Sequence, residues 1–113
     1  DANLDVSIRA RAANCVASTQ RLDRPFELSA LEINGNVHIL NLCGECLVDY
    51  QLYAQKERPD DFVAVAGYGD LATGYICQTA DFAVGGYEPS SSIVNPNSEP
   101  RLKKAISRLL GNE

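Results

Sequence analysis

The cysteines are the residues of this chain whose spacing is most suggestive of chemistry. Cys43-Gly44-Glu45-Cys46 is a Cys-x-x-Cys pair that follows an apolar run, and this is the spacing that thiol oxidoreductases use. Redox activity also requires a helix N-terminus that lowers the pKa of the first thiol, whereas the alternation over residues 47–53 predicts a strand. A thiol-redox role is therefore the alternative hypothesis, and a structural role for the pair is favoured.

All four cysteines of the chain, Cys15, Cys43, Cys46 and Cys77, enter the structural interpretation. A zinc site could use them, but only one pair has the spacing of a zinc knuckle. An even number of cysteines in a chain of 113 residues favours two disulfides. We expect a turn at Gly44-Glu45, with Cys43 and Cys46 each bonded to Cys15 or Cys77. A local Cys43–Cys46 bridge beside a Cys15–Cys77 bridge stays open.

The only histidine, His38, would have to serve any Ser-His-Asp or Cys-His catalytic arrangement. It lies next to a turn at residues 34–36, and a cross-strand pair with Glu32 on a solvated face explains both side chains. The scattered acidic residues are interpreted as solvated turn residues: Asp60, Asp61, Asp70 and Asp81. The sequence thus predicts no catalytic residue, no bound cofactor and no metal site.

Apolar and polar residues alternate along much of the chain, and this period of two predicts strands. The clearest strand covers residues 4–12. Residues 26–33 and 37–42 form a hairpin, because Asn34-Gly35 supplies the positive φ angles of a tight turn. A slip in the alternation at Ala30-Leu31 predicts a bulge or a strand that is covered on both faces. Further short strands are expected at 47–53, 62–66, 74–79 and 81–84, and a surface loop at 88–100.

A C-terminal amphipathic helix is expected over about residues 99–110. Ser98-Glu99-Pro100 supplies an N-cap and a proline in the first turn, and Leu102, Ile106 and Leu109 recur at helical spacing. The expected fold is mainly β, a small antiparallel β-barrel or sandwich with this helix. Residues 1–113 would form a single disulfide-stabilised β domain.

The composition limits the classes of partner. Ten Lys and Arg against fifteen Asp and Glu give a net charge of −5. This charge disfavours binding to nucleic acid. No apolar run approaches the roughly 20 residues that cross a bilayer, so no membrane span is expected. The chain begins at Asp1 and contains no Met, which indicates that a leading segment, most simply a signal peptide, has been removed. With the cysteines, this start predicts a secreted, extracellular protein.

The four cysteines, the Met-free start, the short strands and the terminal helix together resemble small secreted cysteine-containing proteins of filamentous fungi. The resemblance is to those that induce a hypersensitive response in plants and to similar Trichoderma proteins. It implies a non-enzymatic elicitor or effector with a β-barrel-like fold, which recognises a host or microbial protein or glycan. The alternative is a secreted thiol-redox or hydrolytic enzyme that uses Cys43 or Cys46 with His38.

Self-association is expected from the central hairpin, which carries apolar residues in both alternations. Phe26 and Leu28 belong to one face, and Leu31 and Ile33 belong to the other. One short helix can shield only part of the second face, and large apolar patches on monomers are uncommon. The sequence therefore predicts a homodimer, as the resemblance also implies, with strand residues of the hairpin at or near its interface.

Overall fold

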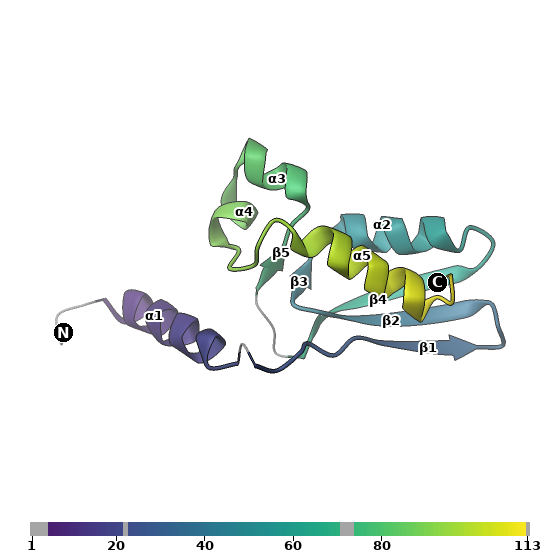
Figure 1. Ribbon diagram of the computed structural model, residues 1–113, viewed down its shortest axis with the longest axis horizontal. Helices are drawn as coiled ribbons and strands as arrows, with labels where there is room; N and C mark the ends of the chain where they lie inside the picture. Colours follow the sequence, from purple (N-terminus) through teal and green to yellow (C-terminus); the bar gives the residue numbers. More distant parts are fainter. Residues whose placement is uncertain (1–4, 22, 71–73, 113) are drawn as a thin grey trace.

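The computed structural model describes residues 5–21, 23–70 and 74–112 (Figure 1). Helices account for 45% of the described residues and strands for 23%. In chain order the elements are α1 (Val6–Thr19), β1 (Ser29–Ile33), β2 (Val37–Cys43), β3 (Glu45–Cys46), α2 (Val48–Glu57), β4 (Phe62–Gly69), β5 (Tyr75–Ile76), α3 (Thr79–Val84), α4 (Tyr87–Ser91) and α5 (Ser98–Leu109). The expectation of a mainly β protein is wrong.

The main sheet has three strands in the order β1-β2-β4. β1 and β2 form the predicted antiparallel hairpin, and Asn34 and Gly35 take the positive φ angles of 53° and 79° that its turn requires. Their register is continuous from Ser29 to Ile33, so the predicted bulge at Ala30-Leu31 is absent. The hairpin is confirmed, whereas its proposed irregularity is wrong.

β4 pairs with β2 in parallel, and α2 is the crossover that joins these two strands. Parallel neighbours need such a crossover, because the chain must return to the same end of the sheet before the second strand begins. β3 and β5 form a separate two-stranded parallel sheet. These are small open sheets with no closed barrel among the described residues, so the barrel expectation is wrong.

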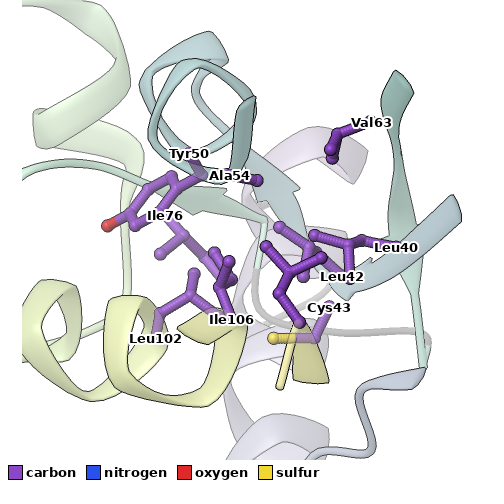
Figure 2. Close-up of a cluster of buried hydrophobic side chains, with 10 residues drawn as sticks. Leu40, Leu42, Cys43, Tyr50, Ala54, Val63, Ile76, Leu102 and Ile106 are labelled. Carbon is purple, nitrogen blue, oxygen red and sulfur yellow. The ribbon is translucent and has the colours of Figure 1, made fainter. Parts of the chain in front are cut away.

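The core lies on one side of the main sheet, beneath α2 and α5. Leu40 and Leu42 of β2, Tyr50 of α2 and Ile106 of α5 have no solvent exposure. Figure 2 shows these side chains converging on one another from strand and helices. The predicted C-terminal helix is confirmed as α5, whose apolar stripe faces the core.

Residues 48–53 and 81–84 lie in helices, contrary to the strands predicted at 47–53 and 81–84. In α2 the two buried residues, Tyr50 and Ala54, are four positions apart, which is the spacing of one helix face. In α3 the side chains of Gln78 and Asp81 form a reciprocal capping box at the helix start. A short alternating run fits both the strand period of two and the helix period of about 3.6. Tertiary packing favours the helix for these two segments. The predicted strand at 74–79 is shortened to β5, and the loop expected at 88–100 begins within α4.

The predicted strand at 4–12 is part of α1; its first residue, Leu4, lies outside the described residues. Asp5 caps the helix by accepting a hydrogen bond of 2.7 Å from the Ser7 amide. The alternating residues include several Ala and Arg, which favour helices. α1 projects away from the rest of the molecule and contributes no buried residue (Figure 1). None of the described helices has the length and apolar character to cross a membrane.

Candidate interaction surface

The Cys-x-x-Cys pair lies between a strand and a helix of a parallel crossover. Cys43 ends β2, Cys46 ends β3, and α2 begins at Val48. The sequence predicts no helix after the pair, and this was the argument against redox activity. The structure does have a helix there. The pKa of these thiols is nevertheless shifted away from that of a reactive cysteine. Burial, aided by the nearby Cys43, raises the pKa of Cys46 to about 12. Burial also raises the pKa of Cys43, and reactive cysteines need a lowered pKa.

The two predicted disulfides are wrong, because all four cysteines are free thiols. Cys15 lies exposed on α1, whereas Cys43 and Cys77 are buried. The thiol of Cys46 donates to the carbonyl oxygen of Cys43 at 3.1 Å. The turn expected at Gly44-Glu45 does not create a Cys43–Cys46 hairpin, since β3 pairs with β5 instead.

Thiol titration tests this arrangement. We expect one fast-reacting thiol in the native protein, Cys15, and four in the denatured protein, because the other three thiols are shielded and protonated. Cys15→Ser should abolish the fast reaction. A reducing agent should leave the melting temperature unchanged. Absence of titratable thiols in the denatured, unreduced protein would contradict the free-thiol assignment.

His38 lies in the protein interior, with 2% of its surface exposed. Its pairing opposite Glu32 is confirmed, but the solvated face predicted for it is wrong. Its Nε2 atom is 3.1 Å from Oδ2 of Asp61, and Nη1 of Arg58 lies 3.8 Å from the same oxygen. The histidine thus connects the start of β2 to the segment before β4.

The structure keeps His38 apart from Cys43. His38 and Cys43 belong to the same strand, five positions apart, which separates their Cα atoms by about 17 Å. His38 and Cys43 are therefore too far apart to act as a Cys-His catalytic pair. Within the described ranges, no three His, Cys, Asp or Glu residues are grouped so that they could hold a metal ion.

A cleft of about 370 Å³ lies beside the smaller sheet and includes Cys46 in its lining. Two carboxylates, Glu45 and Glu88, and two phenols, Tyr68 and Tyr75, line it as well. Burial and the nearby carboxylates raise the pKa of Tyr75. This cleft therefore offers protonated thiol and phenol groups beside carboxylates, with no histidine to act as a base.

On the side of the main sheet opposite the helices, beside the polar pair Ser29–Asn41, lies an uncovered apolar patch. We name it the open sheet face, and it consists of Leu31, Ile33, Val37, Ile39, Phe62 and Ala64. The register places these residues in two rows across the three strands, Leu31–Ile39–Ala64 and Ile33–Val37–Phe62. Partners across neighbouring strands share a face, so the six side chains form one continuous patch.

Solvent exposure confirms that nothing covers this patch among the described residues. Phe62 is 64% exposed, Leu31 56%, Ile33 41% and Ile39 38%. The adjacent positions on β2, His38 and Leu40, are buried on the helix side, as strand alternation requires. A sheet with one packed face normally has polar residues on the other, so this apolar face is the candidate functional surface.

Part of the surface was foreseeable from the sequence. The predicted double-faced hairpin placed Leu31 and Ile33 on a second apolar face, where the structure has them exposed. The same prediction assigned Phe26 and Leu28 to the hairpin, but both precede β1. Phe62 was missed, because its place beside Val37 depends on the parallel pairing of β2 and β4. Comparison with family models, curated proteins and solved structures gave no match for this chain.

Proposed function

We propose that this chain is a non-enzymatic protein-recognition domain, and that the open sheet face is its binding surface. The observation that carries the proposal is the row-by-row continuity of exposed apolar side chains across β1, β2 and β4. Covering such a face with a partner removes its apolar side chains from water, which favours association. The raised pKa values of the thiols and the enclosed His38 support a role without catalysis.

The partner that fits this surface best is a second copy of the chain. Each copy carries a net charge of −5, so two copies repel each other over most of their surfaces. The open sheet face contains six apolar residues and no charged one. Two copies therefore meet there with the least electrostatic repulsion and the largest removal of apolar surface from water, which favours the predicted homodimer.

Secretion and an elicitor or effector role stay predictions. The resemblance that suggested the elicitor role implied a β-barrel-like fold, and the sheets of the described residues form no closed barrel. Free thiols are the usual state in reducing compartments, so the cysteines no longer support secretion. The recognition role proposed here depends on the sheet and requires no particular compartment.

Light scattering over a range of protein concentrations tests the proposal. We expect the wild-type protein to approach twice the 12.2 kDa mass of one chain. Phe62→Ser removes the most exposed side chain of the open sheet face and should raise the dimer dissociation constant at least about tenfold, as loss of an aromatic anchor at an interface does.

Val84→Ser is the matched control, because Val84 is 87% exposed on α3 and lies outside the open sheet face. It should leave the dissociation constant unchanged. Circular dichroism should show that both variants retain the wild-type fold. A wild-type protein that keeps the mass of one chain at millimolar concentration would contradict the proposal.

A further inference from the structure

We infer that α1 of one copy covers the open sheet face of the other, so that the dimer is formed by helix exchange. The inference rests on the proposed function and specifies how the two copies meet. Two separate parts of the chain lack a packing partner: a helix of 14 residues with no buried residue, and a three-stranded sheet with an exposed apolar face. Each part supplies what the other lacks.

Contacts within its own chain stabilise α1 only weakly. A helix of 14 residues is marginal in water without tertiary contacts. The radius of gyration of the molecule is 16.1 Å, whereas a compact chain of this length has about 13 Å. The longest dimension of 56 Å includes the projecting α1 (Figure 1). An additional packing surface is therefore needed to hold this helix.

The apolar side of α1 suits a sheet. Ile8, Ala12, Cys15 and Val16 follow the i, i+4, i+7, i+8 spacing of one helix face, and all four are exposed. Their combination of bulky and small side chains lets a helix approach the two rows of the open sheet face closely. This stripe is the surface that we assign to the contact.

Charge favours an intermolecular contact of this helix. Residues 6–24 contain four arginines and one acidic residue, whereas residues 25–113 contain six Lys or Arg and twelve Asp or Glu. Arg9 and Arg11 lie on either side of the apolar stripe. A basic arm on an acidic body is attracted to the body of a second copy, which offsets the repulsion between the two bodies.

The linker between α1 and β1 is anchored at a point that directs α1 away from its own sheet. Nη2 of Arg21 is 2.5 Å from Oδ2 of Asp70, and the same oxygen accepts a hydrogen bond of 3.0 Å from the Glu27 amide. Asp70 follows the last residue of β4, eight positions from Phe62, which corresponds to about 26 Å of strand. The linker is thus held at the end of the sheet remote from the patch, and α1 continues outward from it.

Area also favours exchange over direct pairing of two sheets. Three strands of about five residues, spaced about 4.8 Å apart, present a face of about 10–15 Å by 17 Å. Two such faces fall well below the roughly 1,000 Å² that a specific interface needs. Exchange adds two helices, each about 21 Å long, and thereby creates two helix–sheet contacts in place of one small sheet–sheet contact.

Disulfide trapping tests the exchange, because Cys15 is both in the proposed contact and the only exposed native cysteine. The wild-type chain is refolded together with a second chain that carries Cys15→Ser and Leu31→Cys, and a small disulfide reagent is added as the oxidant. The expected product is a covalent dimer of one chain of each kind, formed by loss of two protons and two electrons from the two thiols. The same second chain with Val84→Cys in place of Leu31→Cys is the control and should give no such product.

The remaining outcomes separate this inference from the proposed function. A chain that carries both Cys15 and Leu31→Cys, and that forms only an internal bridge, would show that α1 folds onto its own sheet and would overturn the exchange. A non-covalent dimer that forms neither the intermolecular nor the internal bridge would also overturn the exchange, and a weaker dimer of the Phe62→Ser variant would then still support the open sheet face as the contact. A protein that stays monomeric and forms neither bridge would overturn both.

Discussion

Ile106→Ala should lower the free energy of unfolding by about 2–5 kcal/mol. Ile106 is fully buried on α5 and contacts the core formed by β2 and α2 (Figure 2). The substitution removes three buried carbon atoms and leaves a cavity that the surrounding helix and sheet can fill only in part. Urea unfolding followed by circular dichroism measures the change.

Lys104→Ala is the matched control for this prediction. Lys104 lies exposed on the same helix, and an exposed Lys-to-Ala change alters stability by about 0.5 kcal/mol or less. If the two variants unfold at the same urea concentration, α5 does not contribute to the core. Because dimerisation would add to the measured stability, both variants are compared at one protein concentration.

Tyr50→Phe should lower the free energy of unfolding by about 1–3 kcal/mol. The Tyr50 hydroxyl is buried and donates a hydrogen bond of 2.9 Å to the carbonyl oxygen of Cys77. Removing the hydroxyl leaves this carbonyl without that donor in the protein interior. The bond joins α2 to the residue that follows β5, so its loss loosens the attachment of the smaller sheet.

Tyr87→Phe is the control for Tyr50→Phe. The Tyr87 side chain is 70% exposed and contacts the Tyr75 ring edge-on, with ring centroids 5.8 Å apart. The substitution keeps that ring contact and removes only a hydroxyl. Equal melting temperatures for the Tyr50→Phe variant and the wild-type protein would contradict a stabilising Tyr50–Cys77 bond.

The elements that the sequence predicts correctly are those with strong local signals. Asn34-Gly35 specifies the β1–β2 hairpin, and the spacing of Leu102 and Ile106 specifies α5. The strand expected at 62–66 is confirmed within β4. In each case residues close in the sequence determine the local conformation, so the pattern suffices without knowledge of the rest of the fold.

The errors arise where the alternation of apolar and polar residues fits both a strand and a helix. Val48, Tyr50 and Leu52 alternate as a strand would, yet Val48 and Leu52 are exposed and only Tyr50 of the three is buried. The parallel pairing of β2 with β4 makes a crossover helix necessary, and no local pattern reveals that pairing. The cysteine prediction failed similarly, because an even number of cysteines gives no information on the distances between them.

The candidate surface was predictable only in part, because a local pattern does not reveal how the strands pair. Leu31 and Ile33 were assigned to a second apolar face from their own strand alone. The width of the face depends on Phe62 and Ala64, which reach it through the β2–β4 register. The exposure of α1 could not be predicted either, since its residues were interpreted as a strand within the sheet.

Arg58, at the end of α2, donates hydrogen bonds from its Nε and Nη2 atoms to the carbonyl oxygen of Leu110, the Nε bond being 3.0 Å long. One residue therefore connects the C-terminal ends of α2 and α5, and Ser107 adds a bond of 2.9 Å to Glu57. Neither helix can fray from this end without breaking bonds to the other. In native-state hydrogen exchange, the last-turn amides of α2 and α5 should therefore open as one cooperative unit, with similar opening free energies.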